Sequence, residues 1–305
     1  MELGMIGLGR MGAAMTQRLL RGGCRVVVYD QDPARMAAST EEGAVGTQTL
    51  EAVVTHLRPP RAIWVMVPAG DATEHVIEAL TPQLAPGDTI IDGGNAFYRD
   101  SIRRAEHLAS HGVEFLDVGT SGGIRGRETG YCLMVGGHKQ TFGRLEPVMQ
   151  LLAGPDGYFH VGDIGSGHFA KMVHNGIEYG LLQAYAEGFA LLHHAPYSFD
   201  LARLAGLWNH GTIVRSWLLE LAQDALQQEA DLASVRGQID DSGEGRWAVR
   251  EAVALGVPVP VMTEALFARF RSRMADGFGD KLIAALRHAF GGHPVKRGPT
   301  HVERR

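Results

Sequence analysis

Four polar residues that could carry acid and base chemistry lie within one short stretch, KMVHNGIEYG. Lys171, His174, Asn175 and Glu178 stand at positions i, i+3, i+4 and i+7, and this spacing predicts one shared face of a helix. An amine and a carboxylate two turns apart could act as base and acid in a single reaction. A solvated helix face has the same pattern, so other motifs must decide between the two interpretations.

The start of the chain carries a pattern typical of dinucleotide binding. ELGMIGLGRMGAAMTQRLLRGGCRVVVYD is read as a strand, a glycine turn, a helix and a second strand. Gly7 permits the tight turn, Gly9 lets the backbone approach a pyrophosphate, and Gly12 lets the helix pack on the strand. We expect the turn and the helix N-terminus to bind the cofactor phosphates through six residues: Gly7, Leu8, Gly9, Arg10, Met11 and Gly12.

Asp30 ends the second predicted strand. A carboxylate there accepts hydrogen bonds from the adenosine ribose hydroxyls and repels a 2′-phosphate, so the sequence favours NAD over NADP. NADP stays possible because Arg35 is a nearby cation. The alternative is that Asp30 is simply a turn residue.

Three later turns are expected at the same edge of the sheet, since ligands bind beyond the carboxyl ends of parallel strands. Val67 ends one predicted strand, and the backbone from Val67 through Pro68 to Ala69 is expected to pass the nicotinamide side of the cofactor. Asn95 follows another strand with an amide that can donate and accept. A third turn, residues 117–130, exposes Ser121, Gly122 and Gly123, whose hydroxyl and N–H groups suit a carboxylate. Each turn could also be an ordinary loop.

The elements that must position these residues divide the chain into two parts. Short apolar runs alternate with helical stretches in the first half, which predicts an α/β fold with a doubly wound, Rossmann-type parallel sheet. From about residue 169 onward, stretches such as 169–194 and 201–229 carry apolar residues at helical spacing. The expected strands are residues 2–6, 25–29, 62–67, 89–92, 114–118 and 132–135. The expected domains are 1–167 (dinucleotide-binding), 168–292 (all-helical, for substrate and dimerisation) and a polar tail at 293–305.

Composition bounds the class of protein. The 305 residues are 45% hydrophobic and 21% charged, which suits two soluble domains and no membrane span. A net charge of −5 argues against nucleic acid as a partner. With two cysteines and a first segment that reads as a core strand, we expect a cytoplasmic protein with reduced thiols. His107 and His111 have zinc-ligand spacing but no third ligand, so no metal is expected.

The glycine turn, IIDGGNAFYRD, the SGG loop and KMVHNGIEYG together resemble the 6-phosphogluconate dehydrogenase family, within the wider 3-hydroxyacid dehydrogenases and in its shorter bacterial form. The resemblance implies oxidative decarboxylation of 6-phospho-D-gluconate to D-ribulose 5-phosphate and CO2 with reduction of NAD, in the pentose phosphate pathway. It makes Lys171 the base at the C3 hydroxyl and Glu178 the acid that protonates C1.

The resemblance also implies a set of substrate ligands. They are Asn95, Ser121, Gly122, Gly123, His174, Asn175, Tyr179, Arg269, Arg287 and His293. In the family the last two come from a neighbouring subunit, which implies a homodimer or homotetramer with shared C-terminal segments. One departure affects the phosphate site, because Ser242 and Glu244 stand where the long form has lysine and threonine.

Two other functions remain open. A simple 3-hydroxyacid dehydrogenase for a substrate such as 3-hydroxyisobutyrate is disfavoured by His174, Glu178 and Arg269. A non-catalytic nucleotide-binding scaffold is disfavoured by the presence of both Lys171 and Glu178. Unphosphorylated gluconate is a less favoured substrate.

Overall fold

The computed structural model describes residues 1–123 and 125–296. The chain divides into two compact units, Met1–Ile177 and Glu178–Arg305. Helix α8 (Ser166–His193) runs through the division. Most of the tail expected at 293–305 lies outside the described residues, from position 297 onward.

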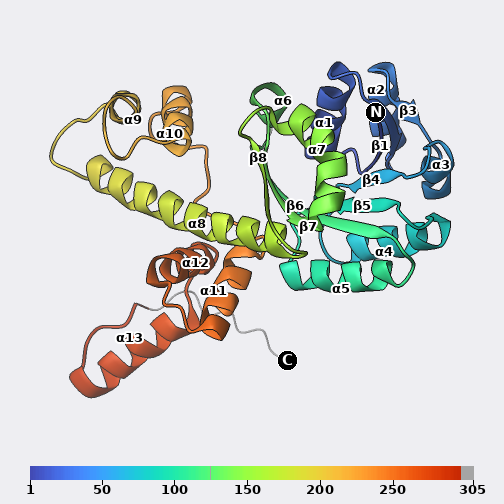
Figure 1. The fold of residues 1–305 in the computed structure, drawn as a ribbon. Helices are drawn as coiled ribbons and strands as arrows, with labels where there is room; N and C mark the ends of the chain where they lie inside the picture. The colour runs from blue at the N-terminus through green and yellow to red at the C-terminus, as the bar shows by residue number, and fades with distance from the viewer. Residues whose placement is uncertain (124, 297–305) are drawn as a thin grey trace. The chain divides into compact units, whose positions relative to one another are not determined.

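The first unit is built on an eight-stranded sheet with the order β3-β2-β1-β4-β5-β6-β7-β8 (Figure 1). Its strands are β1 Glu2–Ile6, β2 Arg25–Tyr29, β3 Val45–Gly46, β4 Ala62–Val65, β5 Thr89–Asp92, β6 Glu114–Ser121, β7 Cys132–Gly137 and β8 Tyr158–Gly162. The first six strands are parallel and follow the order 3-2-1-4-5-6, which is the order of a Rossmann fold. The strand order reverses between the neighbours β1 and β4, and such folds bind their ligands at this point.

One strand, β7, departs from the parallel arrangement of the rest of the sheet. This strand pairs with β6 in antiparallel orientation, from Ser121 opposite Cys132 to Leu116 opposite Gly137. The antiparallel direction follows from the short connection between β6 and β7, because a parallel pair needs a longer crossover. Sequence patterning also missed β3, which has only two residues, and β8, whose Phe159 is exposed at the sheet edge.

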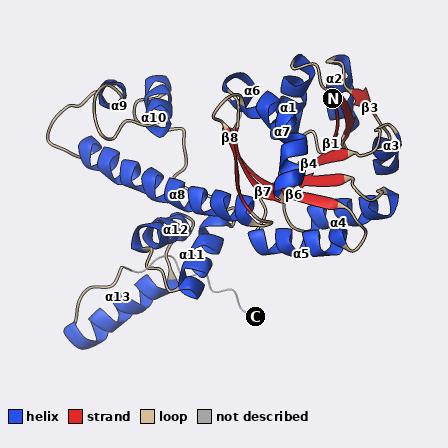
Figure 2. Cartoon of the chain, in the orientation of Figure 1, coloured by secondary structure: helices blue, strands red, loops and turns tan. Residues whose placement is uncertain are grey.

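Helices cover both faces of this sheet (Figure 2). They are α1 Arg10–Arg21, α2 Pro33–Glu41, α3 Leu50–Thr55, α4 Asp71–Leu80, α5 Tyr98–Ala109, α6 Gly126–Thr129 and α7 Lys139–Ala153, with a 3-10 turn at Thr81–Gln83. Met5 packs in a core with side chains of α1 and α7 such as Met15 and Met149. The next residue, Ile6, packs in a second core with side chains of α3, α4 and α5. The strands are therefore apolar on both faces, as expected for parallel strands covered on two sides.

The second unit contains helices and connecting loops, and no strand, in its described part. After the end of α8 it contains α9 Leu201–Trp208, α10 Trp217–Gln228, α11 Glu244–Leu255, α12 Pro260–Ser272 and α13 Phe278–Gly291. The stretch 201–229 therefore forms two helices. The second begins after Ser216, whose side chain caps α10 by accepting a hydrogen bond from the Leu219 N–H. A Rossmann-type domain followed by a helical domain is confirmed. Among the described residues, no helix combines the length and apolar character that crossing a membrane requires.

Candidate active site

The glycine turn between β1 and α1 has the geometry that its motif predicts. Gly7 has φ +93°, a conformation that favours glycine, and a Cβ on Gly12 would overlap the Gly7 carbonyl. A Cβ on Gly9 would meet no protein atom within 4 Å. Gly9 is also the N-cap of α1 and supplies no side-chain cap, so the first N–H groups of the helix can bind an anion.

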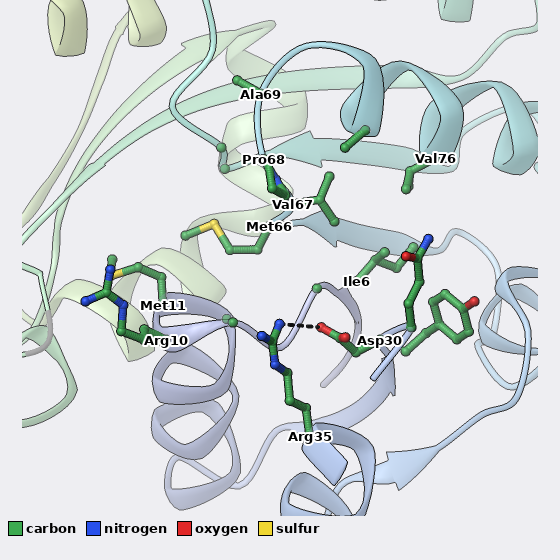
Figure 3. Close-up of a pocket in the computed structure, with 18 of the residues that line it drawn as sticks. Ile6, Arg10, Met11, Asp30, Arg35, Met66, Val67, Pro68, Ala69 and Val76 are labelled. Atoms are coloured by element: carbon green, nitrogen blue, oxygen red, sulfur yellow. Dashed lines mark ion pairs between the residues drawn. The ribbon is translucent and has the colours of Figure 1, made fainter. Parts of the chain in front are cut away.

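A cavity of about 820 Å³ opens beside this turn (Figure 3). Its size is within the range of small-molecule and cofactor sites. Predicted cofactor-binding residues in its lining are Gly7, Gly9, Arg10, Met11, Gly12, Asp30, Val67, Pro68, Ala69 and Asn95. Leu8 is not part of the lining, and its side chain is only 2% exposed. Arg10 and Met11 come from one wall and the loop after β4 from the opposite wall (Figure 3).

Asp30 is hydrogen-bonded to the glycine turn. Its Oδ2 accepts a hydrogen bond from the Leu8 N–H over 2.6 Å, and its Oδ1 accepts one from the Asp32 N–H over 2.8 Å. Arg35 Nη1 lies 3.7 Å from Oδ2, shown by the dashed line in Figure 3. Arg35 also pairs with Asp32 through Nε at 3.3 Å, so its cation is shared between two carboxylates.

The other wall is made by the loops that follow β4 and β5. Thr73, which is fully buried, donates from Oγ1 to the Pro68 carbonyl over 3.0 Å. Asp92 ends β5 and accepts the Gly94 N–H over 3.1 Å. Side chains and backbone therefore both hold the loop that carries Asn95.

Close backbone packing brings Lys171 to the sheet. Asp117 is fully buried and accepts the N–H groups of Gly165 and His168, which fixes the start of α8. A side chain at Gly119 would overlap Lys171 Cβ. The Lys171 side chain therefore begins on the face of α8 that packs against β6. The following residue in β6, Thr120, lines the cavity. Lys171 itself is not among the residues that line the cavity.

One turn further along α8, Asn175 contacts a cavity residue directly. Asn175 Nδ2 donates to Asn95 Oδ1 over 3.4 Å, and Asn175 Oδ1 lies 3.2 Å from His174 Nδ1. Asn175 is buried. The structure therefore brings Asn175 and Asn95 together, and Lys171 lies one helical turn before Asn175 on α8.

The SGG segment differs from the predicted loop. Ser121 is the last residue of β6 and pairs with Cys132, so only Gly122 and Gly123 lie in the turn, with φ +121° and +54°. The strand continues because the antiparallel partner β7 supplies ladder hydrogen bonds to this point. None of the three residues lines the cavity.

In the second unit, Tyr179 and Arg269 form a compact polar cluster with Glu244. The Arg269 guanidinium lies 3.4 Å from the centre of the Tyr179 ring. Glu244, which is buried, accepts hydrogen bonds from Ser242 at 2.7 Å and from Tyr179 at 3.5 Å. Burial raises the pKa of the Tyr179 hydroxyl and outweighs the opposing effect of Arg269, so Tyr179 stays protonated at neutral pH.

The two remaining predicted ligands lie at the C-terminal end of the described chain. Arg287 is exposed on α13, and His293 follows the helix, with its carbonyl 2.8 Å from His288 Nδ1. Glu178 lies seven residues after Lys171 on α8.

Sequence patterning missed several cavity residues, including Tyr29, Gln31, His75 and Val76. Tyr29 and Gln31 adjoin Asp30 and were detectable by position alone, whereas His75 and Val76 on α4 had no local motif. Within residues 1–123 and 125–296, no cluster of three or more His, Cys, Asp or Glu side chains could hold a metal ion.

The geometry fits a dinucleotide. Gly9 leaves open space, α1 presents free N–H groups, and Asp30 offers a fixed carboxylate at the end of β2. These groups match the pyrophosphate and ribose contacts of a Rossmann domain.

Comparison with known families agrees with this geometry. Residues 2–162 match the model of the NAD binding domain of 6-phosphogluconate dehydrogenase, and residues 167–277 match that of its C-terminal domain. The chain belongs to the 6-phosphogluconate dehydrogenase family. The resemblance drawn from its motifs is confirmed.

Several relatives in the 6-phosphogluconate dehydrogenase family show the two chain lengths. An NAD-dependent decarboxylating 6-phosphogluconate dehydrogenase of Haloferax volcanii is 45% identical, over 97% of this chain and 99% of that one. An NADP-dependent enzyme of Bacillus subtilis is 35% identical, over 90% of this chain but only 62% of its own length. A solved 6-phosphogluconate dehydrogenase of Plasmodium falciparum superposes with a TM-score of 0.82 at 30% identity, covering 98% of this chain and 67% of that one.

Proposed function

We propose that the protein catalyses oxidative decarboxylation of 6-phospho-D-gluconate to D-ribulose 5-phosphate and CO2 with NAD. The observation that carries the proposal is the place of Lys171. Its Cβ packs at Gly119, next to the cavity residue Thr120. An amine on a helix that packs against a strand of the dinucleotide site could serve as the base that oxidation of an alcohol needs.

Residues of the chain would bind, orient and move protons in this reaction. Lys171 takes the proton of the C3 hydroxyl, and NAD, when bound, supplies the acceptor for the hydride that leaves C3. The resulting 3-keto acid loses its C1 carboxylate as CO2, while protonated Lys171 stabilises the developing enolate oxygen. Glu178, on the same helix, protonates the carbon that lost CO2, which is C2 of the substrate and C1 of the enediol, to give the ketose.

Asn95, Asn175 and His174 would orient the sugar acid, since they form a hydrogen-bonded series that ends at a cavity residue. Ser121, Gly122 and Gly123 would hold the carboxylate through a hydroxyl and N–H groups.

The phosphate would be bound by cations of the second unit. Arg269 is held against the Tyr179 ring, and a protonated Tyr179 can donate a hydrogen bond. Arg287 and His293 complete the proposed set. Glu244 next to Tyr179 places a carboxylate where the long form has none, so its hydrogen bond from Ser242 and the neighbouring arginine must offset repulsion of the phosphate.

NAD is the preferred cofactor in this proposal, with NADP as the minor one. The support is Asp30, whose carboxylate is fixed by two backbone N–H groups and would meet a 2′-phosphate with like charge. Arg35 lies close enough to reduce that repulsion.

We also propose a homodimer or homotetramer in which α13 and the following residues complete the partner's site. Helix α13 has no buried side chain among the described residues, and its Phe278 and Phe290 are 79% and 78% exposed. Apolar helix faces of this kind mark interaction surfaces. A cytoplasmic location is part of the proposal, because the substrate and product are phosphorylated sugars.

One assay tests the reaction. The purified protein is incubated with carboxyl-labelled 6-phosphogluconate and NAD, and both NADH and labelled CO2 are measured; NADP, gluconate and 3-hydroxyisobutyrate serve as comparisons. We expect NADH and CO2 in equal amounts and little turnover of the other acids. NADH without CO2 would indicate a simple hydroxyacid dehydrogenase, and no turnover with either cofactor would refute the proposal.

A further inference from the structure

Arg104 is a buried cation that the proposed reaction does not use. It lies in α5, and its side chain is only 1% exposed. Nη1 pairs with Asp92 Oδ2 at 2.8 Å, and Nε donates to Glu74 Oε1 at 2.9 Å. Since a buried charge is retained only where its partners hold it in good geometry, the two carboxylates fix the guanidinium in one position.

Through Asp92, Arg104 reaches the loop after β5. Asp92 has one oxygen on Arg104, and its other oxygen accepts the Gly94 N–H over 3.1 Å. Gly94 directly precedes Asn95, which lines the cavity. Any displacement of the guanidinium therefore moves the acceptor that holds this turn.

Through Glu74, Arg104 reaches the loop after β4. Glu74 lies in the first turn of α4, beside the buried Thr73 that donates to the Pro68 carbonyl. Partial burial acts to raise the pKa of Glu74, but hydrogen bonds from Arg103 and Arg104 outweigh it and lower that pKa. Glu74 is thus ionised near neutral pH and anchors α4 to Arg104.

The two loops lie close enough that a side chain at Gly94 would be tightly packed. A Cβ on Gly94 would lie 3.2 Å from Asp92 Oδ1 and 3.2 Å from the Val67 carbonyl. The absence of a side chain at Gly94 allows the loops after β4 and β5 to approach each other. The ion pairs of Arg104 with Glu74 and Asp92 connect the same two loops.

We infer that Arg104 is a positioning residue that holds the two loops, and with them Asn95 and the backbone at Val67, at the separation required for turnover. This inference rests on the proposed function for its kinetic consequence. Its structural consequence, an ordered loop at residues 92–95, does not depend on any activity.

Arg103 offers a matched control. It donates to the same Glu74 carboxylate at 2.6 Å, but its side chain is 58% exposed and its second ion pair is with Asp100. Arg103→Met therefore removes a cation from Glu74 without removing the Asp92 pair, whereas Arg104→Met removes both connections.

The test compares wild type, Arg103→Met, Arg104→Lys and Arg104→Met by hydrogen–deuterium exchange, binding of ADP-ribose and steady-state kinetics. For Arg104→Met we expect faster exchange at residues 92–95 and unchanged ADP-ribose affinity. We expect kcat to fall roughly 10- to 100-fold, because small misplacements of this kind reach that size. Arg104→Lys should be intermediate and Arg103→Met close to wild type.

Equal exchange and equal kcat in the Arg103 and Arg104 variants would overturn the inference, even with a lower melting temperature for Arg104→Met. If that variant does not fold, Asp92→Asn combined with Arg104→Met removes both buried charges and keeps an acceptor for Gly94. Wild-type exchange at residues 92–95 in this double variant would equally overturn it. A wild-type protein without turnover refutes the proposed function, while the exchange result still decides the role of Arg104.

Discussion

The Leu8 N–H donates a 2.6 Å hydrogen bond to Oδ2 of Asp30, which joins the glycine turn to the end of the second strand. Asp30 therefore has two roles. Its oxygen holds the glycine turn, and in the proposed function its charge discriminates between NAD and NADP.

These roles can be separated by two substitutions at one position. Asp30→Asn removes the charge but keeps an oxygen that can accept from Leu8. We expect the ratio of kcat/KM for NAD to that for NADP to fall about 10- to 100-fold, the range for loss of a hydrogen bond to a charged group. Asp30→Ala should also weaken binding of both cofactors. An unchanged ratio in Asp30→Asn would place the discrimination at other residues.

Two glycines of the turn should respond differently to alanine. At Gly12 a Cβ would overlap the Gly7 carbonyl, whereas at Gly9 it would enter open space. We expect Gly12→Ala to lower the melting temperature markedly, with a cost of about 1–3 kcal/mol typical of overpacking. Gly9→Ala should fold with wild-type stability but bind NAD weakly, as measured by calorimetry. Normal NAD affinity in Gly9→Ala would contradict a pyrophosphate position at this residue.

Lys171→Ala should remove the proposed base and leave the cofactor cavity intact. We expect kcat to fall by about 10²- to 10⁴-fold, the usual contribution of a positioned acid or base, with little change in NAD affinity. Stopped-flow detection of NADH in a single turnover isolates the oxidation step. A near-native rate would exclude Lys171 from the mechanism.

Arg269→Met should weaken substrate binding rather than cofactor binding. Removing a charged donor to a phosphate costs about 1.5–3 kcal/mol, so the KM for 6-phosphogluconate should rise about 10- to 100-fold while the Kd for NAD stays constant. Arg273→Met is the matched control, since Arg273 lies near the end of the same helix and donates to the Ile239 carbonyl. Equal effects of both substitutions would argue against a specific phosphate contact.

Glu74 should make the protein sensitive to acid. Its pKa is lowered from 4.5 in the folded protein, so its stabilising effect is complete above that value and is lost as the pH falls toward the folded pKa. We expect the melting temperature of Glu74→Gln to be lower at neutral pH and to decline less than that of wild type below about pH 4.5. Glu78→Gln, an exposed neighbour on α4, should follow the wild-type curve.

Local sequence determined the cofactor turn, because its steric requirements fall within one strand–turn–helix unit. Gly7, Gly9, Gly12 and Asp30 lie in about 30 residues, and each has a demand that only certain residue types meet. The helical face shared by Lys171, His174, Asn175 and Glu178 was also predictable, since helical periodicity depends on spacing alone.

Tertiary structure decided how these units meet. The antiparallel direction of β7, the capping of α8 by Asp117, and the contact of Lys171 with Gly119 join residues far apart in sequence. The pairing of Arg104 with both Asp92 and Glu74 is of the same kind. No local spacing predicts such contacts, because they depend on strand order and on which buried charges find partners once the sheet has closed over them.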